Sequence, residues 1–498
     1  MKAFKAYDIR GVYGRDFDSS DVRKIGFFLP KLLTADTVLV GRDDRASSPE
    51  VFEALCDGIT VAGADVVSIG QCTTPTVYFA TATQRFDAAV MITASHNPAQ
   101  YNGIKVCKTG ALPVDYSTGL AQLEQMCAEQ EIVPAEKRGT VRELDMRGDY
   151  LDFLRQYLPD LSNLKIGVDC SNGMVPLLVK ELLGNKPKYI FDKIDGTFPN
   201  HPPNPLEEEN CADIKKLVKD NGLDIGLIFD GDADRVMFID EQGRYVQPDL
   251  ITAVLTEYYL VETGSTSTSP TPPSGHPSKG GDLSYPSARP ANPLSGKVRD
   301  VCAETLAKAG TEGGFFKERI LHDIRTSKAV TERIIELGGE PHMWKVGHSF
   351  AKMKMRELDC IVGGELAGHY YFRDFFYCDS GMLTALIVLS VAAKLKAEGK
   401  PFSSDIDSLR RYANSGELNF HIEKKEAATA ALVEKFSTEE KPTAVYDMDG
   451  VRIEFADWWF NVRASNTEAY LRLVIEANEE ELLAEKRAAI EKILNPFI

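Results

Sequence analysis

The chain has 498 residues, 43% of them apolar, so it is too long for one hydrophobic core and we expect two to four folded domains. Its formal net charge of −17 argues against nucleic acid and an anionic membrane surface as partners, because both would repel it. The nine cysteines show no paired metal or disulfide spacing, and no apolar signal segment opens the chain. We therefore expect a cytoplasmic protein with reduced thiols.

The first 145 residues alternate short apolar runs with helix-like segments, which is typical of an α/β fold. Strands are predicted at residues 37–40, 65–69 and 88–92, and a helix at 49–62. A second α/β unit begins near residue 150.

This second unit has predicted strands at 165–169 and 224–229. The third unit begins near residue 249, with a helix at 250–261 and a strand at 320–323. Between them, residues 263–319 are rich in Gly, Ser and Pro, and we interpret them as a disordered insertion, because such a composition buries little apolar surface.

The fourth unit ends in a charged amphipathic helix after Asn478. The most apolar stretch, at 382–393, is too short to span a bilayer and predicts a buried helix. We place the domain boundaries so that the units cover residues 1–145, 146–248, 249–376 and 377–498.

A serine and a histidine are adjacent in a loop that follows the strand at 88–92. Pro98 ends any strand there, so Ser95 lies where a side chain can meet a ligand. The neighbouring His96 suggests an activated hydroxyl. The alternative is a simple turn built from Ser, Asn and Pro.

Three aspartates, Asp230, Asp232 and Asp234, alternate directly after a buried strand. Carboxylates that converge in this way repel one another unless a hard cation binds among them, and Mg²⁺ suits oxygen ligands beside phosphate. An EF-hand starts similarly, but Arg235 replaces its glycine and both flanks have the pattern of strands. A haloacid-dehalogenase-type phosphotransferase, with Asp230 as nucleophile, and a solvated acidic turn stay open at this point.

Two further segments carry groups that suit a polar ligand. Glu365 is a carboxylate that can accept bonds from adjacent hydroxyls, and His369 is a candidate acid/base group. The final segment is predicted to bind a phosphate, because a guanidinium fork, hydroxyls and loop amides suit an anion. Its candidate residues are Arg463, Ser465, Asn466 and Thr467.

The segments 95–98, 230–235, 364–369 and 463–468 occur in this order, and together the chain resembles the α-D-phosphohexomutase superfamily in its phosphomannomutase/phosphoglucomutase branch. The resemblance runs from about Tyr7 to the C-terminus, apart from the insertion. It implies an α/β fold of four domains around a central cleft. Three would be related α/β domains with mixed sheets, and the last a smaller α+β domain.

The resemblance also implies roles in the first domain. Ser95 would carry a phosphoryl group in contact with the metal that the aspartates bind. Lys105 would take part in proton transfer or charge stabilisation, and Arg10, which shares an N-terminal signature with Tyr7, would neutralise charge on the transferring group. His96 would orient its neighbour.

In the other domains, Arg235 would hold the metal loop or the phosphoserine, and Arg325 and His348 would contact the ligand. Ala367 stands where relatives often have serine, which removes one hydroxyl contact with the sugar. Asn466 also departs from the common family form.

The implied activity is a Mg²⁺-dependent interconversion of hexose 1- and 6-phosphates, of mannose and/or glucose, through a phosphoserine and a hexose 1,6-bisphosphate, which would also act as activator. The alternatives are a phosphoglucosamine mutase and a non-catalytic sugar-phosphate sensor. Phosphorylated hexoses are the expected partners, and the sequence carries no signal for an oligomeric state.

Overall fold

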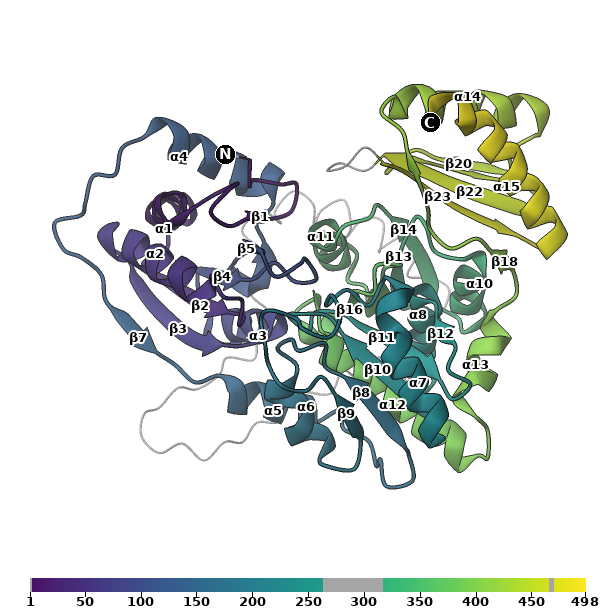
Figure 1. Cartoon of the computed structure of the whole chain (residues 1–498), viewed down its shortest axis with the longest axis horizontal. Helices are drawn as coiled ribbons and strands as arrows, with labels where there is room; N and C mark the ends of the chain where they lie inside the picture. The colour runs from purple at the N-terminus through teal and green to yellow at the C-terminus, as the bar shows by residue number, and fades with distance from the viewer. Residues whose placement is uncertain (1, 263–316, 465–469) are drawn as a thin grey trace, which may run out of the picture.

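The computed structural model describes residues 2–262, 317–464 and 470–498, which form four β-sheets with their helices (Figure 1). Ser465, Asn466 and Thr467 lie outside these ranges, as do residues 263–316 of the predicted insertion at 263–319, so these predictions stay predictions. The predicted end at 319 is wrong, because Arg319 is the first residue of a strand in the third sheet.

The first sheet has the strand order β1-β5-β4-β2-β3-β7, with β6 paired to β5. Its elements are β1 (Ile9–Val12), α1 (Ser19–Leu33), β2 (Thr37–Arg42), α2 (Ser48–Val61), β3 (Asp65–Gln71), α3 (Thr74–Gln84), β4 (Ala88–Ile92), β5 (Tyr101–Lys108), β6 (Leu112–Pro113), α4 (Ala121–Glu129) and β7 (Val141–Glu143). Val38 and Val40 of β2 join one core with α1 and α2, and Leu39 joins the opposite core with α3. Helices therefore cover both faces, and the predicted strands and helix of this unit are confirmed.

The second sheet has the order β12-β11-β10-β8-β9, and the third has β14-β13-β15-β16-β17. The second unit consists of α5 (Arg147–Arg155), β8 (Ile166–Asp169), α6 (Pro176–Leu183), β9 (Lys188–Ile190), α7 (Ala212–Asn221), β10 (Ile225–Phe229), β11 (Val236–Asp240) and β12 (Tyr245–Val246). The third sheet and its helices are α8 (Pro248–Glu257), β13 (Arg319–Asp323), α10 (Lys328–Glu336), β14 (Glu340–Trp344), α11 (His348–Leu358), β15 (Val362–Gly364), β16 (Tyr370–Phe372) and β17 (Cys378–Asp379).

These three sheets share one topology. In each, three neighbouring strands are parallel and two further strands continue the sheet antiparallel, and in the first sheet β7 adds a fourth parallel strand beside β3. Of the three neighbouring strands, the first in the chain is the middle one, the second lies on its outer side, and the third lies between the middle strand and the antiparallel strands. We call this third strand the inner strand; it is β4, β10 or β15. In the first sheet the last antiparallel strand is β1, which comes from the N-terminus. The sequence itself shows no repeat, so this similarity is visible only in the structure.

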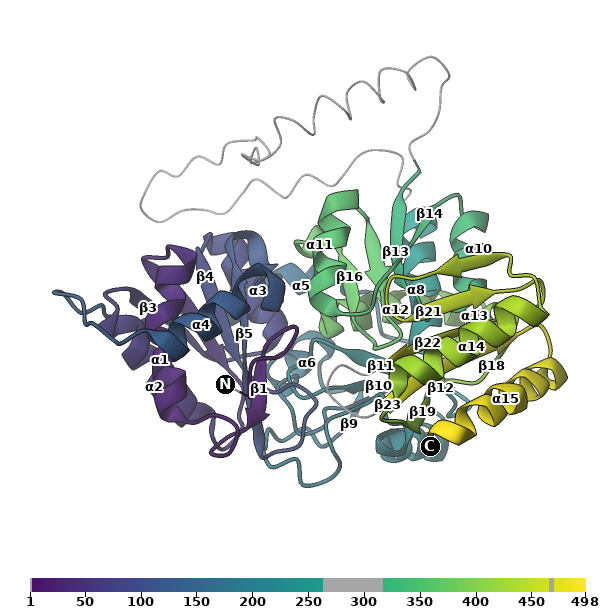
Figure 2. The ribbon, with the colours of Figure 1, turned by 90° about the horizontal axis from the view of Figure 1, so that it is seen from above.

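The fourth sheet is antiparallel, with order β18-β23-β22-β21-β20 and β19 paired to β23. Its elements are β18 (Ala413–Asn414), β19 (Leu418–His421), α14 (Lys425–Glu439), β20 (Ala444–Tyr446), β21 (Val451–Glu454), β22 (Trp458–Ala464), β23 (Tyr470–Ala477) and α15 (Glu480–Leu494). Both helices lie on one side of the sheet (Figure 2), where Phe460 and Val462 of β22 join a core of their own. The alternate residues Asn461 and Arg463 lie on the opposite face. The predicted α+β character of this unit is confirmed.

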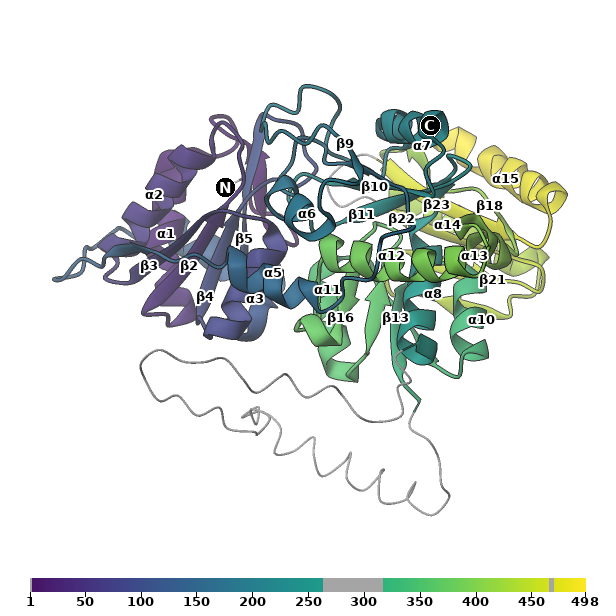
Figure 3. The same cartoon turned by 90° about the horizontal axis from the view of Figure 1, so that it is seen from below.

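Helix α12 (Gly381–Ala397) packs with α5, α8, β10 and β11 and so connects the second and third units, while α13 (Phe402–Leu409) leads to the fourth (Figure 3). The helix is buried as predicted. None of the helices within the described ranges combines the length and the apolarity that a membrane span needs. The eight cysteines in these ranges are buried and unpaired as disulfides. The domain boundaries at 145, 248 and 376 stay predictions.

Candidate active site

Three of the predicted loops occupy the same position in three sheets. The Ser95 loop follows β4, the Asp230 loop follows β10, and the Glu365 loop follows β15, so each lies between the inner parallel strand and the first antiparallel one. The carboxyl end of such a strand is where α/β sheets present ligand-binding loops. The shared topology thus explains why motifs more than a hundred residues apart can meet at one site.

Ser95 is held in a strained loop. Its φ of 49° lies in the left-handed region, which serine rarely adopts and which is typical of functional sites. The buried Arg45 stabilises the loop, because its guanidinium donates to the carbonyl oxygens of Ser95 and Asn97, each at 2.7 Å. Thr93 Oγ1 accepts from the Ser95 amide at 2.9 Å.

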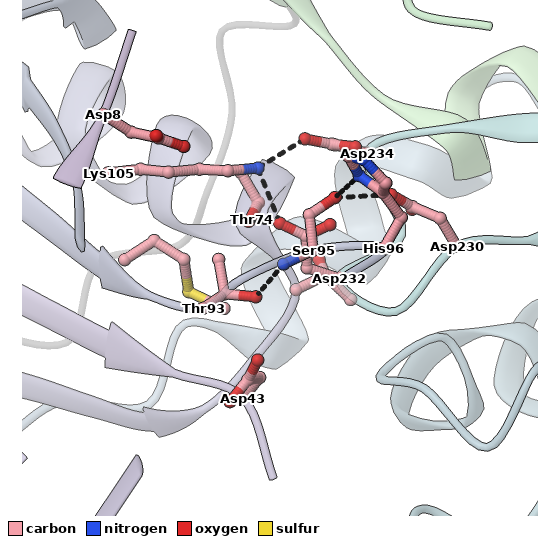
Figure 4. A network of polar contacts seen from close by, with 12 residues as sticks. Asp8, Asp43, Thr74, Thr93, Ser95, His96, Lys105, Asp230, Asp232 and Asp234 are labelled. Atoms are coloured by element: carbon pink, nitrogen blue, oxygen red, sulfur yellow. Dashed lines mark hydrogen bonds and ion pairs between the residues drawn. The ribbon is translucent and has the colours of Figure 1, made fainter. Parts of the chain in front are cut away.

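The serine loop and the aspartate loop meet across the first two units (Figure 4). Ser95 Oγ donates to Asp230 Oδ2 at 2.7 Å, and Arg235 Nη2 lies 3.4 Å from the same Oγ. The contact is close enough that a Cβ at Gly231 would lie 2.5 Å from the carbonyl oxygen of Ser95. Glycine at this position therefore lets the two loops pack together.

The three carboxylates of the aspartate loop are buried and lie together with a lysine. Oxygens of Asp230, Asp232 and Asp234 lie within 4.8 Å of one another. Lys105 Nζ donates to Asp232 Oδ2 and to Asp234 Oδ2, both at 2.7 Å. Among the described residues, Asp232 Oδ1 and Asp234 Oδ1 have no hydrogen-bond partner. Buried acceptors without partners, in a set of oxygen ligands, fit a hard cation.

The charged groups in this cluster shift one another's pKa values. Burial, together with Asp234 and Asp232, holds the pKa of Asp230 well above its usual range. Burial also acts to raise the pKa of Asp234, but Lys105, His369 and Arg235 together outweigh it and the pKa is lowered. Burial and the nearby Arg235 hold the pKa of His96 well below its usual range, so this ring, 3.3 Å from Ser95 Oγ, is neutral.

The third loop places a carboxylate and an imidazole beside the aspartates. Glu365 accepts from the Gly347 amide at 2.7 Å and from the Tyr371 hydroxyl at 3.1 Å. His369 Nδ1 lies 2.6 Å from Asp379 Oδ2 and 3.9 Å from Asp234 Oδ1. The ring centroids of His348 and His369 are 5.6 Å apart.

Arginines gather where the third and fourth units meet. Arg325 Nη1 donates to Glu417 at 3.0 Å, Arg472 Nη1 donates to the same carboxylate at 3.2 Å, and Arg463 Nη1 lies 3.5 Å from Asp449. Within the described part of the chain, Arg463 Nε and Nη1 find no hydrogen-bond partner. These buried donors fit an anion, as the sequence predicted for Arg463.

One cleft of about 950 Å³ connects these groups. Residues of all four units line it. They include two predicted catalytic residues, His96 and His369, and most of the predicted substrate-binding residues: Tyr7, Arg235, Arg325, His348, Glu365, Ala367 and Arg463. Ser95 is 3% exposed, and Arg10 Nη1 donates to Asn97 of the serine loop at 2.8 Å. The structure therefore brings every predicted site residue within the described ranges to one region.

Sequence analysis missed several residues that shape this site. Arg45 holds the serine loop, Thr74 donates to Asp232, and Asp379 contacts His369. A signal existed for Arg45, because a run of charged residues follows the buried strand β2. Asp379 lies in a two-residue strand with no pattern of its own.

The strands around the aspartate loop exclude the EF-hand alternative. Strands β10 and β11 flank it and pair with each other, whereas an EF-hand requires helices.

The chain matches four family descriptions along its length. They are phosphoglucomutase/phosphomannomutase alpha/beta/alpha domain I at residues 1–131, domain II at 148–243, domain III at 299–412, and the C-terminal domain at 417–493.

Curated relatives and a solved structure agree with this match. A phosphomannomutase of Salmonella montevideo is 33% identical over 99% of both chains. A phosphomannomutase of Escherichia coli K12 is 33% identical over 98% of this chain and 97% of its own. The crystal structure of a phosphoglucomutase/phosphomannomutase family protein from Burkholderia thailandensis superposes with a TM-score of 0.79, at 28% identity, over 99% of this chain and 97% of its own.

The motifs, the three related sheets and these relatives lead to one conclusion. The chain belongs to the phosphoglucomutase/phosphomannomutase family of the α-D-phosphohexomutases, and it is a mutase that acts as an intramolecular phosphotransferase.

Proposed function

We propose that this mutase interconverts hexose 1-phosphates and hexose 6-phosphates, of mannose and/or glucose, through a phosphorylated Ser95 and a hexose 1,6-bisphosphate. The observation that carries the proposal is the hydrogen bond of 2.7 Å from Ser95 Oγ to Asp230 Oδ2, which places a hydroxyl of the first unit against the carboxylates of the second. Phosphoryl transfer depends mostly on positioning and on charge neutralisation, and this contact supplies the position.

Asp230, Asp232 and Asp234 would hold Mg²⁺, together with an oxygen of the phosphorylated Ser95. Asp232 Oδ1 and Asp234 Oδ1, which lack a hydrogen-bond partner among the described residues, support this assignment. When bound, the cation neutralises charge on the transferring phosphoryl group.

The chain's own residues supply the remaining charge and proton handling. Arg235 and Arg10 lie beside the serine loop and neutralise phosphoryl oxygens. Lys105, which the aspartates hold in its charged form, stabilises charge or returns a proton to the sugar oxygen. His369 is the second group at the cleft that can exchange a proton with a sugar hydroxyl.

The phosphate that does not react needs a site of its own. Arg463 has donors without a hydrogen-bond partner among the described residues, and Arg325 and His348 line the same cleft. Ser465, Asn466 and Thr467 complete this site in the proposal. Binding energy from the remote phosphate positions the reacting end, in either orientation of the sugar.

The sugar itself meets the third loop. Glu365 accepts bonds from adjacent hydroxyls, and Tyr7 contributes an aromatic wall against His348, with ring centroids 5.8 Å apart. Ala367 leaves out one hydroxyl contact, which favours tolerance between mannose and glucose. The eight cysteines in the described ranges are buried and unbridged, which agrees with a reducing cytoplasm as the place of action.

The decisive experiment follows mannose 1-phosphate and glucose 1-phosphate by phosphorus NMR, with Mg²⁺ and a trace of glucose 1,6-bisphosphate. We expect both 6-phosphates to form, and mass spectrometry to find one phosphate on the peptide that contains Ser95. Ser95→Ala should lose at least about 1,000-fold in kcat and the modification, because no acceptor remains.

Ser68→Ala is the matched control and should stay active, because Ser68 is a buried serine of β3 whose Oγ accepts from the Gly70 amide. Conversion of glucosamine 1-phosphate alone would favour the phosphoglucosamine mutase. A phosphoprotein labile to hydroxylamine would point to an aspartyl phosphate and contradict the proposal.

A further inference from the structure

We propose that Asp379, with Lys352 behind it, is a positioning residue that fixes the His369 ring with Nδ1 protonated, so that Nε2 is the nitrogen that meets the substrate. The inference rests on the proposed function, in which His369 exchanges a proton with a sugar hydroxyl.

The contact between Asp379 and His369 is short and rigidly supported. Asp379 Oδ2 lies 2.6 Å from His369 Nδ1, and the Asp379 side chain is fully buried. Its backbone is fixed twice, because Asp379 pairs with Tyr371 in the sheet and precedes Ser380, whose side chain caps α12. The carboxylate therefore has little freedom to move away from the ring.

Lys352 forms an ion pair with the other oxygen of the carboxylate, although the two atoms lack the geometry of a hydrogen bond. Its Nζ lies 2.7 Å from Asp379 Oδ1 and 3.9 Å from the centre of the Tyr78 ring, and its side chain is 1% exposed. Lys352 follows His348 by one turn of α11, so the ammonium reaches the site from the same helix face as that histidine. A buried carboxylate paired with a buried ammonium stays ionised.

An ionised carboxylate can only accept hydrogen bonds, so His369 Nδ1 must carry the proton of this contact. The other nitrogen, Nε2, then has a free lone pair when the ring is neutral, and it belongs to a residue that lines the cleft. Carboxylates that orient a histidine in this way determine its tautomer in acid/base sites. Tyr371, with a stacked ring at 6.3 Å, limits rotation of the imidazole.

A second metal site at Asp234, His369 and Asp379 is the competing interpretation, because their ligand atoms lie within 4.8 Å of one another. The two interpretations differ in the state of His369 Nδ1, which is the ring nitrogen nearest to Asp234 and Asp379. A metal bound at Nδ1 would require that nitrogen to carry no proton, whereas the contact with Asp379 requires a proton there.

The test starts with the wild-type protein without substrate, labelled with ¹⁵N in its histidines. Long-range nitrogen–proton correlations should show His369 as the Nδ1–H tautomer, with the resonance assigned by its loss in His369→Gln. An Nε2–H tautomer in the wild type would overturn the proposal. This measurement does not depend on mutase activity, so failure of the proposed function would be recognised separately, as inactive wild-type enzyme.

Asp379→Asn keeps the shape of the side chain but offers a donor to Nδ1. We expect the tautomer to change to Nε2–H and kcat to fall by about 10- to 100-fold, the usual effect of losing a partner that orients a histidine, with KM nearly unchanged. The matched control is Asp240→Asn, because Asp240 is equally buried but pairs with Arg244 outside the cleft. It should retain both the His369 tautomer and kcat.

Lys352→Met provides a second variant should Asp379→Asn fail to fold. It removes the ammonium while keeping the apolar stem, and we expect a shifted Nδ1 resonance and a kcat reduced at unchanged KM. Unchanged kcat and an unchanged resonance in Lys352→Met or Asp379→Asn would show that the pair serves stability alone.

Discussion

A single carboxyl group at the rim of the cleft couples stability to pH. Asp249 is 4% exposed and accepts from the amides of Leu250 and Ser327, at 3.0 and 2.9 Å. Burial raises its pKa to about 6. The folded protein therefore keeps a proton on Asp249 at a pH where the unfolded chain, with a pKa of about 4, has lost it.

Because the folded-state pKa is the higher one, the stability from this group is complete below the unfolded pKa and is lost as the pH rises through the folded pKa. Asp249→Asn cannot titrate. We expect the difference in unfolding free energy, wild type minus variant, to fall by about 1.4 kcal/mol between about pH 5 and about pH 7. Denaturant unfolding of both proteins across that range measures it, and a constant difference would contradict the shifted pKa.

At the scale of single residues, the sequence predicted which side chains belong to the site better than it predicted the side chains that contact them. Ser95 and the aspartates could be recognised because the groups that suggest their chemistry lie in one short segment: a histidine next to the serine, and three carboxylates at alternate positions. Arg45 acts on a residue 50 positions further along the chain, and Asp379 acts on a histidine ten positions before it; no pattern in the sequence encodes either contact. The sequence therefore predicted the groups that would react, and the structure adds those that hold them.

At the scale of elements, the three inner strands share a position but not a sequence. β4 and β10 are recognisable as buried apolar runs, whereas β15 contains two glycines and was not predicted as a strand, although the motif that follows it was recognised. Predicting the strands requires a local hydrophobic pattern, but predicting that their loops converge requires the order of strands in each sheet. That order depends on long-range pairing, which the hydrophobic pattern does not determine.

An arginine of strand β21 forms hydrogen bonds from the fourth unit to the third. Arg452 is 1% exposed, and its Nη1 donates to the carbonyl oxygens of Ile324 and Thr326, each at 2.8 Å. Its guanidinium also lies 3.6 Å from the centre of the Trp459 ring. These carbonyls adjoin Arg325, so the same contact supports a residue of the cleft.

Arg452→Met should weaken this attachment, because it leaves two buried carbonyl oxygens without their donor. We expect a loss of about 3 kcal/mol in unfolding free energy, together with faster hydrogen exchange in β21 and β22. Arg487→Met, in an exposed ion pair on α15, is the control and should change stability by less than about 0.5 kcal/mol. Equal effects of the two substitutions would show that the buried contact contributes nothing.

At the scale of the whole molecule, an acidic protein must bind an anionic substrate. The net charge of −17 repels sugar phosphates, and the arginines at the junction of the third and fourth units oppose that field locally. Two of these arginines already bind a carboxylate of the protein, because Arg325 and Arg472 both donate to Glu417. A phosphate that uses these guanidinium groups therefore competes with a carboxylate of the protein.

Glu417→Gln should remove this competition while keeping the shape of the side chain. We expect inorganic phosphate to bind about 3- to 10-fold more tightly by calorimetry, because breaking a bond to a neutral amide costs less than breaking one to a carboxylate. Glu423→Gln, at an exposed glutamate just beyond β19, should leave the affinity unchanged. Weaker binding in Glu417→Gln would mean that the carboxylate orients the arginines instead of competing for them, and the fourth unit would then reach the substrate with its anion site already arranged.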